Sequence, residues 1–368
     1  MNLAPYATGN DSEYAKRDLP ENYVSQYQNP FLVDAYRITQ SPFFSRLGFK
    51  SQLSWDIDQP ELRNRETHTM SAVLNGLEIA HGLGLNPYFI QASILGHDIG
   101  HTPFGHAGEK ALKKLLKLDF SHEEQSDRIL KYILKTNPTF GVSDAIIKHR
   151  ASKDGGAHLT PESKVLKLAD KIDNNINDFF DLRNLKISEW TQAPLEALST
   201  LGVTMDTLAR NPVQASEIMR NTIISSIIKN SEISADEKSI DIKTSEEVQN
   251  AQQTLYKFQY SIYENNGRFI DRDKTAQWAT ETLYDFYKKD TTAFRETDFH
   301  KYLYAKDPKS YKSYIEQTSY DRQFCDTYAF LTDANVIKLC REIKPNKSKQ
   351  YFSNFSKSLE LTSIMRKI

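Results

Sequence analysis

Residues 94–109 read ILGHDIGHTPFGHAGE, a stretch that holds three histidines, one aspartate and one glutamate. His97 and Asp98 are adjacent, and His101 and His106 follow closely. A helix that only packs against its neighbours has no need of so many imidazoles in one turn-rich segment. Imidazole nitrogens and carboxylate oxygens together suit Zn²⁺, Mn²⁺, Fe²⁺ or Ni²⁺. The stretch therefore predicts a site that holds a divalent cation and handles phosphate.

Two other segments offer further ligands. Residues 67–81 predict an amphipathic helix, because apolar residues recur at steps of three and four, and His68 lies in its first turn. Residues 160–180 predict another helix, on which Asp170 follows an apolar run. Adjacent helical residues point about 100° apart, so the His-Asp pair reaches one ion only near a helix end, which its flanking glycines permit. No alternating apolar run of strand type is present, and the predicted fold class is all-α.

Composition narrows the class of protein. The 368 residues carry 47 Lys+Arg and 48 Asp+Glu, so the net charge of -1 argues against a dedicated non-specific nucleic-acid binder. Two cysteines, Cys325 and Cys340, provide no disulfide framework and no cysteine zinc site. No apolar run is long enough to span a bilayer, and the N-terminus lacks a signal-peptide pattern. We therefore expect a cytoplasmic protein without a membrane partner.

The motifs resemble those of the HD-domain phosphohydrolases, whose metal set is H…HD…D, and more closely those of their deoxynucleoside-triphosphate triphosphohydrolase (dGTPase-like) branch. That branch typically reads R-x-x-H, HDIGHxPFGHxGE, H-x-x-Q-S and A-D-x-I. The corresponding segments here are residues 65–68, 97–109, 122–126 and 169–172. The order and the spacing match, and HDIGHTPFGHAGEK is the most specific segment. The resemblance covers residues 30–180 and continues more weakly to Tyr263 and to Thr332-Asp333.

The resemblance implies roles for individual residues. The metal ligands would be His68, His97, Asp98 and Asp170. His106 would transfer a proton, and Glu109 would orient it. A simpler alternative for Glu109 is a carboxylate stabilised by a helix N-terminus, and both roles are compatible.

The resemblance also implies contacts with a substrate. The triphosphate would be surrounded by Arg65, His101, His122 and Lys171. Gln52 and Asp178 would bind the sugar 3′-OH, and Tyr263 would lie under the sugar and exclude a 2′-OH. Two of these residues have a simpler interpretation. Lys171 could be a solvated lysine, and Tyr263 could be an aromatic residue of the core. One position departs from the branch, because Asn174 stands where a tyrosine is usual near the phosphates.

The leading hypothesis is a metal-dependent hydrolase that converts a dNTP, with dGTP one candidate, to deoxynucleoside and inorganic triphosphate. One alternative is an HD phosphohydrolase acting on nucleoside monophosphates, cyclic nucleotides or nucleic-acid ends. A second is a nucleotide-sensing or single-strand-binding module with weak turnover. The cofactor would be one divalent ion, with Mn, Mg, Fe and Zn left open.

The predicted organisation has four parts. The first is an arm over residues 1–29 that is flexible or lies on the surface, and the second is an HD core over residues 30–190. The third is a set of further helices over residues 191–343 that complete the nucleotide pocket and make oligomer contacts. A mobile basic tail covers residues 344–368. The resemblance implies that the chain forms a homo-oligomer, as relatives of this type often do. Some of them have a regulatory nucleotide site between subunits, so an allosteric nucleotide is a further candidate partner. Nucleic acid stays open as a partner, although the charge does not indicate it.

Overall fold

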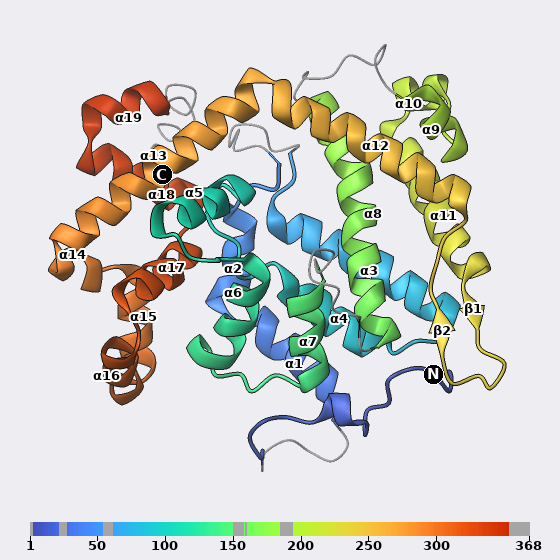
Figure 1. Ribbon diagram of the computed structural model, residues 1–368, viewed down its shortest axis with the longest axis horizontal. Helices are drawn as coiled ribbons and strands as arrows, with labels where there is room; N and C mark the ends of the chain where they lie inside the picture. Colours follow the sequence, from blue (N-terminus) through green and yellow to red (C-terminus); the bar gives the residue numbers. More distant parts are fainter. Residues whose placement is uncertain are drawn as a thin grey trace, which may run out of the picture.

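The computed structural model describes residues 3–21, 28–53, 62–149, 158, 160–184 and 194–352. Within these ranges the chain is helical except for loops and one antiparallel hairpin, in which Glu232 lies opposite Asp241 (Figure 1). The all-α prediction is confirmed. None of the described helices is both long enough and apolar enough to cross a membrane.

The first half of the chain contributes these elements: η1 (Glu13–Ala15), α1 (Pro30–Thr39), α2 (Pro42–Ser45), η2 (Arg46–Phe49), α3 (Arg65–Leu83), α4 (Pro87–His97), α5 (His106–Leu116), α6 (His122–Arg128), η3 (Ile129–Ile133), α7 (Phe140–Lys148) and α8 (Pro161–Asn184). The second half contributes α9 (Leu195–Thr200), α10 (Met205–Arg210), α11 (Pro212–Asn230), β1 (Glu232–Ile233), β2 (Ile240–Asp241), α12 (Glu246–Asn265), α13 (Gly267–Lys289), α14 (Thr291–Arg295), α15 (Asp298–Lys306), α16 (Pro308–Gln317), α17 (Tyr320–Phe330), α18 (Asp333–Ile343) and α19 (Pro345–Tyr351).

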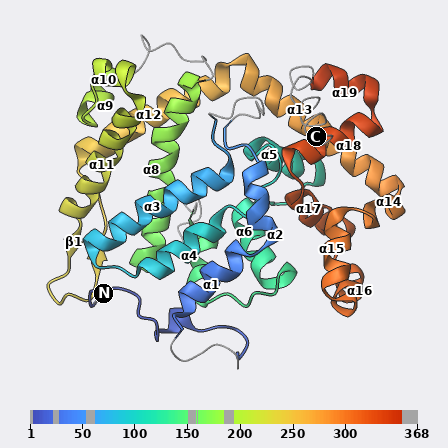
Figure 2. The ribbon, with the colours of Figure 1, turned by 180° about the vertical axis from the view of Figure 1, so that it is seen from behind.

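Helices α3, α4 and α8 form the centre of the larger core. The side chain of Asn64 accepts a hydrogen bond from Thr67 N and starts α3, and Gly84 ends it with a positive φ of 65°. Asn86 caps α4, and Pro87 occupies its first turn. In the view from behind, α1, α3 and α4 lie in front of α8 (Figure 2). This arrangement brings the start of α3, the end of α4 and the middle of α8 together.

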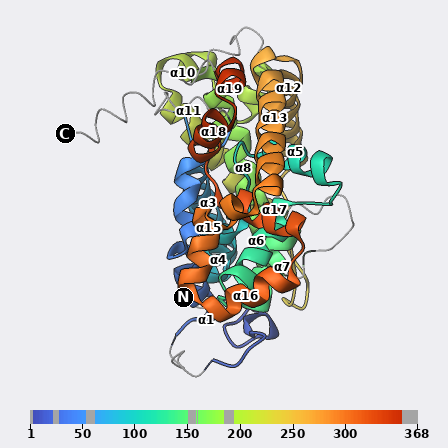
Figure 3. The same cartoon turned by 90° about the vertical axis from the view of Figure 1, so that its left-hand side faces the viewer.

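A second, smaller core forms around α5, α13, α17 and α18. Its buried side chains include Phe104, Leu112, Leu283, Phe324 and Ile337. Seen edge-on, α12 and α13 run along one face of the molecule and α3 along the other (Figure 3). The loop that follows His97 lies between the two cores, because Ile99 belongs to the first and Phe104 to the second.

The N-terminal arm is fastened to the larger core. Thr8 donates hydrogen bonds from its N and Oγ1 to the buried carboxylate of Glu162, at 2.9 and 2.7 Å. Arg17 pairs with Asp34, whose side chain is almost fully buried. The described part of the arm is therefore held by specific contacts along the surface.

The C-terminal region differs from its prediction in two places. Residues 320–343 read as one helix, yet α17 ends at Phe330 and α18 begins after Thr332, which caps Asn335 N in a capping box. The tail begins with α19, and Tyr351 stacks on Trp278 with 4.4 Å between ring centroids. This part of the predicted tail is therefore helical and packed on α13, and residues 353–368 lie outside the described residues. Residues 56–65 and 153–159 also read as loops, and residues 56–61, 153–157 and 159 of these segments lie outside the described residues.

Candidate metal and phosphate site

Three helices bring the four predicted metal ligands together. His68 lies in the first turn of α3, His97 is the last residue of α4, and Asp170 lies in the middle of α8. Asp170 Oδ1 lies 3.1 Å from His68 Nε2 and 3.8 Å from His97 Nε2. Asp98 Oδ1 lies 3.3 Å from His97 Nε2. His68, His97 and Asp98 are each at most 3% exposed.

The two histidines are oriented by partners on their other ring nitrogen. His97 Nδ1 lies 2.6 Å from the carbonyl oxygen of Ile94, so Nδ1–H donates and Nε2 keeps its lone pair. His68 Nδ1 lies 2.6 Å from Asp173 Oδ2. The buried Nε2 of His97 makes no hydrogen bond. Metal-ligating histidines commonly have this arrangement, so the donor set fits a divalent cation.

The charges around these residues favour a cation. Burial alone lowers the pKa of His68, but the carboxylates of Asp173 and Asp170 outweigh it and raise this pKa to about 10. Burial raises the pKa of Asp98, yet His97 and His101 outweigh it and hold this pKa well below its usual range. Asp98 is therefore ionised and ready to bind a metal.

A second group of side chains lies next to the first. The rings of His101 and His122 stack with 3.8 Å between centroids. Glu109 Oε2 lies 3.0 Å from His122 Nδ1 and 3.4 Å from His106 Nδ1. Burial raises the pKa of Glu109, but hydrogen bonds from His106 and His122 outweigh it and lower this pKa, so Glu109 is anionic. The His106 side chain is 49% exposed, which leaves it open to a ligand.

The loop before α5 is held by the distant residue Asp333. Its Oδ1 accepts from Phe104 N at 2.9 Å, and its Oδ2 accepts from Ser51 N at 3.0 Å. Phe104 and Gly105 have φ of 62° and 56°. A Cβ at Gly105 would lie 2.7 Å from the guanidinium of Arg65. A side chain at position 105 would therefore be strained and crowded, and glycine there lets the chain turn and place His106 at the start of α5.

Two residues predicted to surround a triphosphate have other surroundings. Arg65 is buried, and its Nη1 lies 2.6 Å from Asp98 Oδ2. It therefore pairs with a predicted metal ligand. Lys171 follows Asp170 on α8 and is exposed. Its contact with phosphate stays a prediction.

The predicted sugar contacts follow one face of α8. Gln52 Nε2 donates to Asn174 Oδ1 at 3.0 Å, and Asn174 Nδ2 donates to Asp170 Oδ1 at 2.8 Å. One turn further, the Tyr263 hydroxyl donates to Asp178 Oδ2 at 3.3 Å. Eight residues of α-helix span about 12 Å, so this face extends from the metal ligands over the length of a nucleoside.

Sequence reasoning missed three residues near these groups. Arg63 pairs with Asp173 and also with Asp178, at 2.9 Å from its Nη2 to Asp178 Oδ1. Asp173 lies three residues after Asp170, and that spacing on a helix could have indicated it. His149 has no predicted role in the site, yet it is 4% exposed and its ring centroid lies 5.2 Å from that of His97. A lone histidine after an apolar helix gave no signal.

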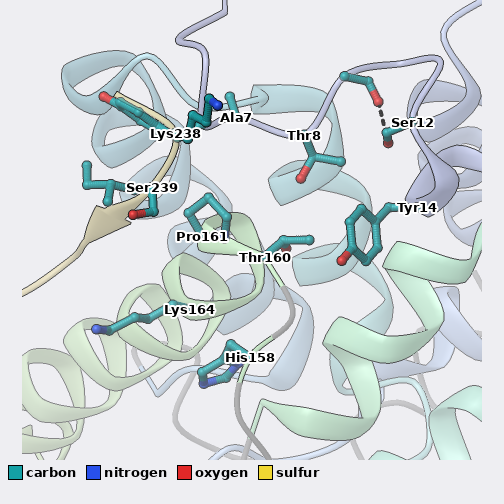
Figure 4. A pocket seen from close by; sticks show the side chains of 13 residues that line it. Ala7, Thr8, Ser12, Tyr14, His158, Thr160, Pro161, Lys164, Lys238 and Ser239 are labelled. Atoms are coloured by element: carbon teal, nitrogen blue, oxygen red, sulfur yellow. Dashed lines mark hydrogen bonds between the residues drawn. The ribbon is translucent and has the colours of Figure 1, made fainter. Parts of the chain in front are cut away.

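A separate pocket of about 440 Å³ lies between the N-terminal arm, the start of α8 and the β-hairpin (Figure 4). Lys164, Lys238 and His158 are among its lining residues. None of the residues predicted to bind metal or substrate lines it. This pocket is therefore separate from the candidate site, which is identified by its cluster of histidines and carboxylates.

Comparison with known proteins identifies the family of the chain. A model of the HD domain matches residues 65–175, which include all four predicted ligands. A deoxyguanosinetriphosphate triphosphohydrolase-like protein of Clostridium perfringens (strain SM101) is 30% identical over 313 residues, with 82% of this chain and 83% of the relative covered. The chain belongs to the deoxyguanosinetriphosphate triphosphohydrolase-like family.

A second relative has the same description. A protein of the same description from Caldanaerobacter subterraneus is 28% identical over 346 residues, with 93% of this chain and 92% of the relative covered. A crystal structure of a phosphohydrolase from Bacteroides thetaiotaomicron has a TM-score of 0.49 at 16% identity and covers 86% of this chain and 72% of that chain. As an HD-domain member of the deoxyguanosinetriphosphate triphosphohydrolase-like family, the protein is a metal-dependent phosphohydrolase.

Proposed function

We propose that this phosphohydrolase converts a deoxynucleoside triphosphate to the deoxynucleoside and inorganic triphosphate. The observation that carries the proposal is the continuous polar face of α8. Asp170 stands among the metal ligands, Asn174 joins it to Gln52, and Asp178 contacts Tyr263. A nucleotide whose α-phosphate lies at Asp170 would have its sugar at Asp178 and Tyr263.

His68, His97, Asp98 and Asp170 would hold a divalent ion, which would lower the pKa of water and offset charge on phosphate oxygens. The attacking water forms a bond to the α-phosphorus and gives up one proton to solvent, and the bond from phosphorus to the sugar 5′-oxygen breaks. The leaving oxygen takes its proton from His106. The anionic Glu109 supports this role, because a carboxylate near His106 Nδ1 stabilises the protonated imidazole.

The remaining residues bind and orient the substrate. His101 and His122 lie beside His106 and would donate to phosphate oxygens. Tyr263 would stand under the deoxyribose, where its ring leaves no room for a 2′-OH. Burial raises the pKa of Asp178 to about 7, although the charge of Arg63 lowers it. Near neutral pH this carboxyl can therefore donate a hydrogen bond to a 3′-OH when protonated, or accept one when ionised.

The proposal is tested by incubating the protein with each dNTP and each NTP, with Mn²⁺ and then Mg²⁺, and separating products by chromatography. We expect deoxynucleoside and intact triphosphate, lost in an Asp98→Ala control. Stepwise release of phosphate, or turnover of monophosphates only, would overturn the substrate assignment in favour of a general HD phosphohydrolase. The homo-oligomer, the regulatory nucleotide and the cytoplasmic location stay predictions.

A further inference from the structure

Two buried charged residues outside the proposed catalytic groups contact the loop that carries His101 and His106. Lys50 comes two residues before Gln52, and Asp333 is the first residue of α18. Both side chains are almost completely buried. A buried charge is costly unless it is paired or hydrogen-bonded, so the contacts of these two residues indicate what they do.

Lys50 joins the loop to the end of α17. Its Nζ donates to the carbonyl oxygen of His101 and to that of Ala329, both at 2.6 Å. Ala329 lies in the last turn of α17, where carbonyl groups have no partner inside the helix. The ammonium group therefore satisfies the end of this helix and fixes the backbone of His101 at the same time.

Asp333 joins the same loop to the segment before α3. Its Oδ1 accepts from Phe104 N at 2.9 Å, and its Oδ2 accepts from Ser51 N at 3.0 Å and from Ser51 Oγ at 2.6 Å. Ser51 forms a β-bridge with Asn64, the residue that caps α3. An acidic residue in the first turn of a helix can act on the helix dipole alone. Here both carboxylate oxygens bind partners outside α18, so stabilisation of α18 does not account for these contacts.

The backbone that Asp333 holds has an unusual conformation. Phe104 has a φ of 62°, in the left-handed region that a bulky residue rarely adopts. Such a residue persists only where its surroundings fix it, and such positions are common at functional sites. Phe104 stands between His101 and His106, whose ring centroids lie 5.1 Å apart. A change in its backbone would therefore move one imidazole relative to the other.

We propose that Lys50 and Asp333 are positioning residues, which hold residues 101–104 so that His101 and His106 keep the geometry needed for hydrolysis of a phosphate ester. Their hydrogen bonds go to the loop, to Ser51 and to α17, so their loss should leave the metal ligands in place. The inference rests on the proposed function for the roles of the two histidines. It holds for any phosphate ester that this phosphohydrolase turns over.

Asp333→Asn tests the carboxylate side of this arrangement. The variant keeps the shape of the side chain, but an amide nitrogen cannot accept, so either Phe104 N or Ser51 loses its acceptor. A misplacement of about 1 Å can cost about 10²-fold in rate, so we expect kcat to fall about 10–100-fold. We expect a much smaller change in KM and an unchanged Kd for Mn²⁺. Lys50→Met removes the donor to the His101 carbonyl and should lower kcat in the same way.

The matched control is Asn335→Ala, which breaks the capping box of α18 and leaves the contacts of Asp333 in place. It should lower the melting temperature and keep the wild-type kcat. Each variant is assayed with dNTPs and, in parallel, with bis(p-nitrophenyl) phosphate, so absence of dNTP turnover is distinguishable from failure of this inference. Wild-type kcat in a folded Asp333→Asn protein, or an equal loss of kcat in Asn335→Ala, would overturn the proposal.

Hydrogen exchange read by mass spectrometry gives a second readout that needs no substrate. We expect the amide of Phe104 to be protected in the wild type, and this protection to be lost in Asp333→Asn and kept in Asn335→Ala. An unprotected Phe104 amide in the wild-type protein would overturn the proposal even if Asp333→Asn does not fold.

Discussion

The amide of Asn174 donates a hydrogen bond to the predicted metal ligand Asp170, with 2.8 Å between Nδ2 and Oδ1. Its carbonyl oxygen accepts from Gln52 Nε2 at 3.0 Å. The branch that the chain resembles usually has a tyrosine at this position. Here an asparagine links a predicted sugar contact directly to a metal ligand.

Asn174→Ala removes a hydrogen bond that orients Asp170. We expect the Kd for Mn²⁺ to rise about 10–100-fold, which is typical when a group behind a metal ligand is lost. Isothermal titration calorimetry measures this Kd. Asn184→Ala, on the exposed last residue of α8, is the matched control and should leave it unchanged. An unaltered Kd in Asn174→Ala would contradict the assigned role.

His106→Ala removes the proposed proton donor without touching a metal ligand. We expect kcat to fall about 10²–10⁴-fold, the usual contribution of general acid catalysis, while the Mn²⁺ content stays at the wild-type value. Steady-state kinetics and elemental analysis check the two parts. Lys110→Ala changes an exposed residue of the same helix and serves as control. Wild-type kcat in His106→Ala would exclude this residue as the acid.

Tyr263→Ala opens the space proposed to exclude a 2′-OH. We expect the ratio of kcat/KM for a dNTP over its NTP to fall, whereas Tyr263→Phe keeps the ring and should keep most of the discrimination. Tyr260→Ala alters a tyrosine on the same helix that is 48% exposed, and it should not change the ratio. If the alanine variant discriminates as well as the wild type, Tyr263 is a core residue only.

Lys50 makes the stability depend on pH. Its Nζ donates to the carbonyl oxygens of His101 and Ala329, both at 2.6 Å, and burial lowers its pKa from 10.5 to about 7. Between these values the unfolded chain binds more protons, so the free energy of unfolding rises with pH from about 7 to about 10.

Lys50→Met removes this rise and leaves two buried carbonyls without donors, at a cost of about 1–3 kcal/mol each. We expect the variant to be less stable than the wild type, with a difference that grows from pH 7 to pH 9.5 in urea unfolding. Lys110→Met is the control for an exposed lysine. A difference independent of pH would mean that Lys50 stays charged throughout.

Local sequence was enough to predict most of the residues that the structure brings together at the candidate site. Residues 97–109 form one turn and the start of one helix, and their spacing follows from helix geometry. The contacts that could not be predicted join distant segments. Asp333 holds Phe104 from 229 positions away. His149 enters the cluster only because α6 and α7 pack beside α4.

Contacts between distant segments also explain where the predicted fold differs from the observed one. The periodicity of residues 320–343 continues through Leu331, and only the capping box at Thr332 reveals two helices. In the tail, Tyr351 stacks on Trp278 of α13, and the sequence of the tail alone does not indicate this distant partner. Arg63 escaped notice because its three carboxylate partners all lie on α8, more than 100 positions later.

The central claim is hydrolysis of a dNTP between the α-phosphorus and the 5′-oxygen. The most direct measurement is ³¹P NMR of the phosphorus products, with mass spectrometry of the deoxynucleoside, after turnover of dGTP and of each other dNTP with Mg²⁺ in water enriched in ¹⁸O. We expect inorganic triphosphate as the single phosphorus product, with ¹⁸O on a terminal phosphorus and none in the deoxynucleoside. Pyrophosphate or orthophosphate as first product, or ¹⁸O in the deoxynucleoside, would contradict it.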